Sequence, residues 1–265
     1  MTALQRLRAD LGGTWTPLSG GLSHEVWHVA RDAGPALIVR LPDGSPDAAL
    51  FARDPSAEWI ALNALAATGI APRPVSQLPG VVVAEYLPGE SWAGEFAAVG
   101  RCLRMLHEQP VPDGLPRDGR DPRDGGRAIL AMCRDRALLA REPERSGGSG
   151  MPVFLHGDPV PGNIVMARGH ARLIDWQCPA VGPAPHDIAL FLSPAMQVIA
   201  RGRPASDTEI AAFIDGYGHL PDGDWPALHW QIACHCQWRI EQGHEAYRAA
   251  LAAELRALDQ ATRLQ

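Results

Sequence analysis

Three polar residues that can hold a metal ion or move a proton lie within one short stretch of the sequence. The stretch reads F-L-H-G-D-P-V-P-G-N-I-V-M and continues, after a short polar gap, with L-I-D-W. Asp158 and Asn163 belong to its first part, and Asp175 belongs to its second. The polar gap contains Gly169 and predicts a hairpin turn between two short strands. Such a hairpin brings Asn163 and Asp175 close together.

These residue types suit a magnesium site with a base beside it. A carboxylate and an amide oxygen that converge on one point form the all-oxygen site that magnesium prefers, with phosphates and water as the remaining ligands. Asn163 and Asp175 supply that pair of oxygens. Asp158 can then accept the proton of a substrate hydroxyl, or orient that hydroxyl. Isolated Asp and Asn residues near Pro and Gly are usually turn formers, but the spacing of the whole set favours kinase-type phosphoryl transfer.

The pattern H-G-D-x-x-x-x-N followed by I-D-W resembles that of the aminoglycoside phosphotransferase and choline/thiamine kinase superfamily, whose fold is similar to that of protein kinases. The resemblance covers nearly the whole chain. It implies that Asp158 is the catalytic base and that Asn163 and Asp175 bind magnesium. It also implies that Asp187, in P-H-D-I-A-L, braces the catalytic loop. One departure follows I-D-W, where residues 182–184 read G-P-A and relatives often have G-D-P.

A glycine pair near the N-terminus is expected to cover the nucleotide. Gly20 and Gly21 form a predicted turn between two β-like stretches. Without side chains, the backbone there can approach a bound group closely and offer amide hydrogens to phosphate oxygens. Two glycines in a hairpin are more often a simple turn, so the nucleotide-binding role is what the resemblance implies.

A second pair of N-terminal residues combines two buried charges. Residues 36–41 predict a strand, and relatives place a lysine or an arginine there to hold the nucleotide phosphates, a role that Arg40 has by resemblance. The next predicted helix is capped by Asp54 and carries Glu58 on its buried side. Because both charges are costly unless they are paired, we predict an Arg40–Glu58 ion pair. The alternative is that Glu58 is a solvated first-turn acid favoured by the helix dipole.

The resemblance and the element pattern together predict an α+β, two-lobed protein-kinase-like fold. Residues 81–86 form a strong strand that is, by resemblance, the hinge between the lobes, where backbone groups such as those of Glu85 meet the adenine. Residues 1–88 are expected to form a small nucleotide-binding lobe with an antiparallel sheet and one helix. Residues 89–265 are expected to form a larger, mainly helical catalytic and substrate-binding lobe. Within it, residues 228–258 have helical spacing.

Composition limits the partners. The 265 residues carry a formal net charge of −6, which argues against a protein that binds nucleic acid through phosphate contacts. The longest apolar run is too short and too interrupted to span a membrane, and the N-terminus lacks a signal-peptide core. We therefore expect a cytoplasmic protein without a nucleic-acid or membrane partner. The five cysteines predict no disulfide framework, and the C-H-C at residues 234–236 lacks the second ligand pair of a structural metal site.

The sequence leaves the phosphate acceptor open. An ATP- and magnesium-dependent kinase is expected to transfer the γ-phosphate to a small molecule with a hydroxyl group, and the first candidate is a choline-, ethanolamine- or thiamine-like cation. An aromatic cage would suit that cation, and the tryptophans in the expected catalytic lobe are its candidates, unless they pack the core. They are Trp92, Trp176, Trp225, Trp230 and Trp238. An aminoglycoside would instead require acids such as Glu241 and Glu245. A non-catalytic nucleotide-binding regulator of the same fold is the third alternative.

Overall fold

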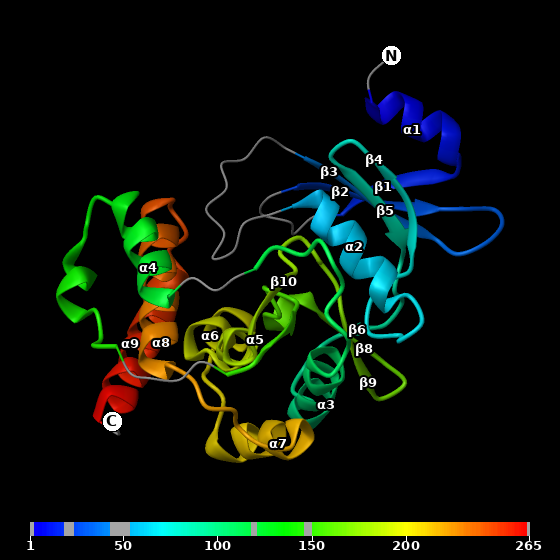
Figure 1. The fold of residues 1–265 in the computed structure, drawn as a ribbon. Helices are drawn as coiled ribbons and strands as arrows, with labels where there is room; N and C mark the ends of the chain where they lie inside the picture. Colours follow the sequence, from blue (N-terminus) through cyan, green and yellow to red (C-terminus); the bar gives the residue numbers. More distant parts are fainter. Residues whose placement is uncertain (1–2, 19–23, 43–53, 118–120, 146–149, 264–265) are drawn as a thin grey trace.

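The computed structural model describes residues 3–18, 24–42, 54–117, 121–145 and 150–263 (Figure 1). Its N-terminal part is a five-stranded antiparallel sheet with the strand order β1-β2-β3-β5-β4. The strands are β1 (Thr14–Leu18), β2 (His24–Ala30), β3 (Leu37–Pro42), β4 (Pro74–Leu78) and β5 (Val81–Glu85). Two helices accompany them, α1 (Ala3–Leu11) and α2 (Pro55–Leu65).

Strand β3 has the alternation that the sequence predicts. Leu37, Val39 and Leu41 belong to a small core that also includes Leu7 of α1. The opposite face of the strand therefore carries Arg40 toward α2. Helix α2 begins where Asp54 accepts a hydrogen bond from the Ser56 N–H at 2.8 Å, with Pro55 as the first helical residue.

The C-terminal part is mainly helical, which confirms the predicted fold class. Its helices are α3 (Phe96–His107), α4 (Pro122–Ala131), α5 (Pro185–Leu192), α6 (Pro194–Arg201), α7 (Asp207–Tyr217), α8 (Trp225–Glu241) and α9 (Tyr247–Arg263), with short 3₁₀ turns η1 (Ala137–Arg141) and η2 (Pro161–Asn163). Two small antiparallel sheets accompany them. They contain β6 (Glu90–Ser91), β8 (Ile164–Ala167) and β9 (His170–Leu173), and β7 (Pro152–Leu155) with β10 (Ala180–Pro183).

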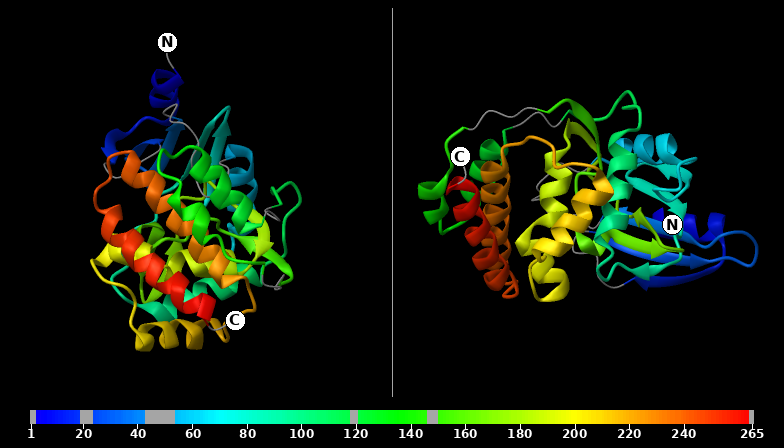
Figure 2. Two further views of the ribbon diagram at one scale, coloured as in Figure 1. Left: turned by 90° about the vertical axis from the view of Figure 1, so that its left-hand side faces the viewer. Right: turned by 90° about the horizontal axis from the view of Figure 1, so that it is seen from below.

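The largest core joins the two parts of the chain. Leu62 and Leu65 of α2 belong to the same buried cluster as Phe96 and Leu103 of α3 and Trp176. Helices α4, α8 and α9 lie at the end of the molecule opposite the N-terminal sheet, as both Figure 1 and Figure 2 show. A boundary after residue 88, between β5 and β6, stays a prediction.

Helices α8 and α9 replace the single helical run expected for residues 228–258. The chain turns between Glu241 and Tyr247, and Gly243 in this turn has φ 91°, a value that favours glycine. None of the helices in the described ranges is long and apolar enough to cross a bilayer.

Candidate active site

The predicted hairpin is present and ends at the first candidate metal ligand. Strands β8 and β9 pair with Ile164 opposite Leu173, and Arg168 and Gly169 make the two-residue turn with φ values of 52° and 78°. Two successive positive φ values give the tight turn that antiparallel strands favour. Next to the paired strands, the N–H of Ile174 donates to the carbonyl of Asn163 at 2.9 Å. The backbones leading to Asn163 and Asp175 are thus held side by side.

The catalytic loop between β7 and η2 can accommodate only glycine at its centre. Gly157 has φ 85°, and a Cβ atom there would lie 1.9 Å from the carbonyl oxygen of Cys178. Beyond it, the amide of Asn163 donates to the backbone carbonyl of Asp158 at 2.9 Å and to its carboxylate at 3.1 Å. Because Nδ2 makes both contacts, Oδ1 of Asn163 is the amide atom that can bind a cation. The structure therefore brings Asp158 and Asn163 into direct contact.

The side chain of Asp187 holds the backbone of this loop, as the resemblance implied. The Asp187 carboxylate is fully buried and accepts hydrogen bonds from the N–H groups of His156 at 2.8 Å and Gly157 at 2.9 Å. Burial alone would raise the pKa of Asp187, but hydrogen bonding with His107 and the charges and N–H groups around it lower that pKa below its usual range. The brace is therefore an ionised carboxylate.

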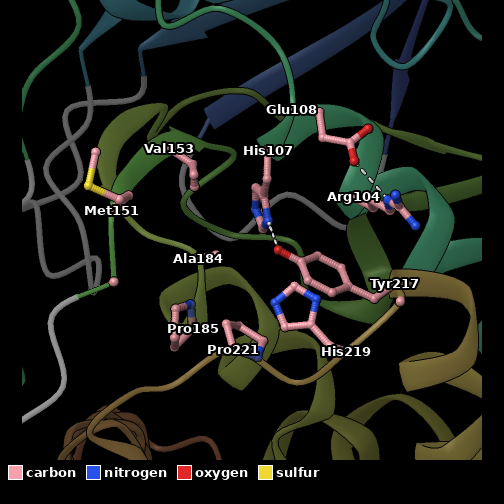
Figure 3. Close-up of a pocket in the computed structure, with 12 residues that line it drawn as sticks. Arg104, His107, Glu108, Met151, Val153, Ala184, Pro185, Tyr217, His219 and Pro221 are labelled. Carbon is pink, nitrogen blue, oxygen red and sulfur yellow. Dashed lines mark hydrogen bonds and ion pairs between the residues drawn. The ribbon is translucent and has the colours of Figure 1, made fainter.

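Two residues that the sequence did not indicate extend this brace. His107 on α3 contacts Asp187 through Nε2 at 3.2 Å and the hydroxyl of Tyr217 on α7 through Nδ1 at 2.8 Å. Figure 3 shows the Tyr217 hydroxyl turned toward the His107 ring, at the wall of a pocket of about 440 Å³. None of the predicted site residues lines this pocket. Neither His107 nor Tyr217 stands in a recognisable motif.

Arg40 on β3 makes two ion pairs, one with α2 and one with the segment that follows β9. It pairs with Glu58 on α2, as predicted, and with the carboxylate of Asp175 at 2.9 Å, which was not predicted. Burial would lower the pKa of Arg40, but the charges of Asp175 and Glu58 outweigh it and raise that pKa. Burial raises the pKa of Glu58, and Arg40 offsets part of the rise. Arg40 is thus a permanent cation between two acids.

Gln177 adds a further contact that the sequence did not indicate. Its side-chain amide donates to the same Oδ1 atom of Asp175 that Arg40 contacts. The backbone carbonyl of Gln177 accepts a hydrogen bond from the N–H of Asp54, the residue directly before α2, at 3.2 Å. The segment after I-D-W is thereby fixed against the N-terminal part. Asp175 itself has φ 67°, a left-handed conformation that costs energy for most residues and is found at functional positions.

The donor chemistry of this site fits magnesium. Asn163 offers an amide oxygen, and Asp175 offers a carboxylate whose side chain is 33% exposed. Two hard oxygen ligands leave room for phosphate oxygens and water, which is the usual magnesium arrangement. In the described ranges, this site included, no group of three or more His, Cys, Asp or Glu side chains is arranged to hold a metal.

The other nucleotide-binding predictions have different outcomes. Gly20 and Gly21 lie outside the described residues. Glu85 ends β5, and its N–H donates to the carbonyl of Arg73 at 2.8 Å. The N–H of the next residue, Tyr86, donates to the carbonyl of Ala36 at 2.7 Å. The roles of Gly20, Gly21 and Glu85 in nucleotide binding stay predictions.

Most of the candidate substrate-binding residues have other partners. Trp92, Trp176 and Trp230 are at most 7% exposed and belong to core clusters. Glu241 accepts the N–H groups of residues 134 and 135. Glu245 pairs with Arg248 on the surface. The described tryptophans therefore do not form one open cage, and both acids have local contacts.

Comparison with known proteins identifies the family. Residues 14–230 match the sequence model of the phosphotransferase enzyme family. No curated protein matches the sequence. A macrolide 2'-phosphotransferase, MphH from Brachybacterium faecium, is similar in structure, with a TM-score of 0.62, 21% identity and 96% of each chain covered.

Two further solved structures share this fold. The choline kinase LicA from Streptococcus pneumoniae has a TM-score of 0.67 and 14% identity, and the match covers 97% of this chain and 98% of that one. The amicoumacin kinase hAmiN, solved with AMP-PNP, Ca²⁺ and its substrate, has a TM-score of 0.62 and 16% identity, with 100% of this chain and 94% of that one covered. At these identities, the similarity establishes the protein-kinase-like fold.

Proposed function

Because this chain belongs to the phosphotransferase enzyme family and is a small-molecule kinase with a hydroxyl acceptor, we propose that it transfers the γ-phosphate of ATP and requires Mg²⁺. One observation carries the proposal. The amide of Asn163 holds the Asp158 carboxylate at 3.1 Å on a loop whose backbone is anchored by buried Asp187. A preorganised carboxylate of this kind can act on an acceptor without rearranging.

Asp158 is the proposed catalytic base. It would orient the acceptor hydroxyl and take its proton as the bond to phosphorus forms. The proton passes from the hydroxyl oxygen to a carboxylate oxygen of Asp158, and ADP leaves with the electron pair of the broken P–O bond. Asn163 keeps the carboxylate in place by its contacts to Asp158.

Asn163 and Asp175 are the residues that would hold Mg²⁺. When bound, the metal supplies positive charge next to the phosphate oxygens. Arg40 supplies a second, fixed positive charge, and its forked donors suit phosphate oxygens. Glu58 would orient Arg40 through their ion pair. Gly20, Gly21 and the backbone near Glu85 are proposed to cover the phosphates and meet the adenine, in a lobe that ends near residue 88.

The acceptor candidates remain those that the sequence proposed: choline-, ethanolamine- or thiamine-like cations first, and aminoglycosides second. The related folds belong to proteins named for macrolide, choline and amicoumacin, so the architecture accommodates different acceptors. The buried tryptophans and the occupied acids Glu241 and Glu245 reduce the support for a purely cationic acceptor. A cytoplasmic location, which the sequence predicts, would suit an enzyme that consumes ATP.

The test is ATP turnover across a panel of choline, ethanolamine, thiamine, homoserine and aminoglycosides. A kinase converts ATP to ADP only when a competent acceptor is present, and the phosphorylated product is then detectable by mass spectrometry. The Asp158→Asn variant is the matched control, because it should bind ATP and not transfer phosphate. Nucleotide binding without product from any acceptor would favour the regulator.

A further inference from the structure

Arg239 on α8 is a buried cation without a carboxylate partner. It is 9% exposed, and it forms no ion pair with any residue in the described part of the chain. Its Nε and Nη2 atoms are buried and have no hydrogen-bond partner there. A buried charge is costly unless it is paired and hydrogen-bonded. The position of Arg239 is therefore unfavourable for folding alone.

The side-chain contacts that Arg239 does make are with aromatic residues, and they include a hydrogen bond to the Tyr247 hydroxyl. Its guanidinium carbon lies 5.4 Å from the ring centroid of Trp238 and 5.4 Å from that of Tyr247. Cation–π contacts recover only part of the cost of burying a guanidinium. A second buried atom in this corner, Nδ1 of His235, also has no hydrogen-bond partner among the described residues. The His235 ring lies 6.2 Å from the Tyr247 ring.

Another buried arginine, on the neighbouring helix α4, has the carboxylate and carbonyl partners that offset the cost of burying a guanidinium. Arg123 on α4 is 5% exposed. It pairs with Asp121 at 2.6 Å and Asp224 at 2.5 Å, and it donates to the carbonyls of Pro143 and Glu144. Every nitrogen of that guanidinium has a partner. Arg239 differs in having buried donors left over, and such donors in a folded protein call for a specific explanation, of which a bound polar group is one.

The corner formed by Arg239 and Tyr247 lies within electrostatic reach of the catalytic base. Burial raises the pKa of Tyr247, the charge of Asp158 raises it further, and Arg239 lowers it. Tyr247 and Val160 of the catalytic loop pack against one hydrophobic cluster that includes Cys178 and Cys236. Helix α6 contacts both η2 of that loop and α9. Figure 1 shows α6 between the centre of the molecule and the α8–α9 pair.

We propose that Arg239 determines acceptor specificity by binding a carboxylate of the acceptor, which therefore carries an anionic group as well as the hydroxyl that is phosphorylated. The assignment rests on the proposed kinase function. A guanidinium binds a carboxylate through two parallel hydrogen bonds, and Nε with Nη2 is one such donor pair. Cations bind to the faces of aromatic rings, so Trp238 and Tyr247 beside the guanidinium would also suit an ammonium group of the same acceptor. An amino acid or a betaine-like hydroxy acid has this combination.

The experiment uses acceptor pairs that differ only by one carboxylate, with the full-length protein, ATP and Mg²⁺. The pairs are L-serine with ethanolamine, L-homoserine with 3-amino-1-propanol, L-carnitine with β-methylcholine, and D-glucuronate with D-xylose. Binding is measured by calorimetry and phosphorylation by product formation. In at least one pair, the carboxylate compound should have a kcat/KM about 30-fold higher than its partner, the ratio typical of a buried charge pair. Arg239→Met should raise the KM of the carboxylate compound until the two compounds have the same kcat/KM. Arg239→Lys should retain part of the difference.

Two outcomes of this comparison overturn the proposal: no carboxylate compound is preferred over its partner, or Arg239→Met keeps the preference. The matched control is Arg248→Met, because Arg248 is an exposed arginine near the α8–α9 turn whose one ion pair within the described ranges is with Glu245. It should leave the acceptor preference as in the wild type.

The melting temperature of the variants distinguishes a role of Arg239 in acceptor specificity from a structural role. Without acceptor, Arg239→Met should not lower the melting temperature, since it removes an unpaired buried charge. Arg123→Met should lower it clearly, since it leaves Asp121 and Asp224 unpaired. Equal losses in the two variants would make Arg239 structural. If carboxylate compounds bind in an Arg239-dependent way but are not phosphorylated, the kinase function alone is refuted. If only cationic acceptors without a carboxylate are phosphorylated, the Arg239 assignment alone is refuted.

Discussion

Arg40 and Asp175 form an ion pair of 2.9 Å that joins the N-terminal sheet to the segment after the β8–β9 hairpin. One of them is the cation proposed for the nucleotide phosphates, and the other is the carboxylate proposed for magnesium. Their charges neutralise each other, and Glu58 shares the same guanidinium. Nucleotide and metal therefore have to share or break this contact. Each should make the binding of the other more favourable, because a metal on Asp175 frees Arg40 for phosphate.

The first prediction concerns Arg40 and Glu58. Arg40→Ala should raise the KM for ATP at least about tenfold, because it removes a charged hydrogen bond to phosphate. Glu58→Gln should have a smaller effect, since Glu58 orients the cation without touching the phosphates. The double mutant should show a coupling on the order of 0.5–3 kcal/mol in urea unfolding, as contacting residues do. Strictly additive effects on stability and ATP affinity would mean that the pair is not maintained in solution.

The second prediction concerns the catalytic base. Asp158→Asn should lower kcat by about 10²–10⁴-fold, the usual contribution of a positioned base. ATP affinity, measured by calorimetry, should change little because the base acts on the acceptor. A folded variant that no longer binds ATP would contradict this assignment.

The third prediction concerns the metal ligands. Asp175→Ala should abolish the magnesium dependence of ATP binding, and Asn163→Ala should weaken it in the same direction. Titration of Mg²⁺ against bound nucleotide measures the effect. Asn163→Ala should also lower kcat at saturating Mg²⁺, since the Asp158 carboxylate loses its 3.1 Å contact. An unchanged magnesium midpoint in both variants would contradict the proposed site.

The fourth prediction tests the brace behind the catalytic loop. Tyr217→Phe leaves Nδ1 of His107 without its hydroxyl partner. The loss of a buried hydrogen bond should reduce the free energy of unfolding by roughly 1–3 kcal/mol. It should also lower kcat while the KM for ATP stays the same. Thr262→Val is the control, because it removes a hydroxyl hydrogen bond to the carbonyl of Leu258 within α9, away from the brace and the nucleotide segments. Equal effects of the two substitutions would exclude a positioning role for Tyr217.

The hairpin and the helix start were predictable from sequence because their signals are local. Gly169 identifies the turn between β8 and β9, and Asp54 with Pro55 identifies the start of α2. The Arg40–Glu58 pair was predictable for a different reason. Each residue places a charge on the buried side of its own element, and the two charges are opposite. The contact of Arg40 with Asp175 depends on how the two parts of the chain pack, which no local pattern encodes.

His107 and Tyr217 were not predictable for the same reason. They lie on α3 and α7, where one histidine and one tyrosine fit an ordinary amphipathic pattern. Their roles arise because α3 packs against α7, which places the Tyr217 hydroxyl on His107, and His107 in turn contacts Asp187. The break between α8 and α9 had one local signal, Gly243, which a uniform helical spacing concealed.

The fifth prediction is a pH dependence of stability. Burial, with the charge of Arg239 adding to it, lowers the pKa of His235 to about 4. In the unfolded chain a histidine titrates near pH 6.5. Between these two values the unfolded state binds the proton and the folded state does not, so stability falls as the pH decreases from about 6.5 to about 4. The loss due to His235 should approach about 3 kcal/mol.

Urea unfolding at pH 4.5 and pH 7 measures this dependence. His235→Gln should be less sensitive to pH than the wild type. Arg239→Met should also be less sensitive, because without the neighbouring charge the pKa of His235 rises. If His235→Gln retains the full slope, another group is responsible for it.

The way in which Asp187 holds the catalytic loop affects how such an enzyme can diverge. It binds two backbone N–H groups, so the anchoring does not depend on the side chains that face an acceptor. Helices α8 and α9 lie outside this anchor and are joined by a short turn. With Arg239 of α8 in its proposed role, substitutions on these two helices would change which molecule is phosphorylated without disturbing the transfer step. Gene duplication followed by drift in this helical pair would give paralogues with the same chemistry and different metabolic roles.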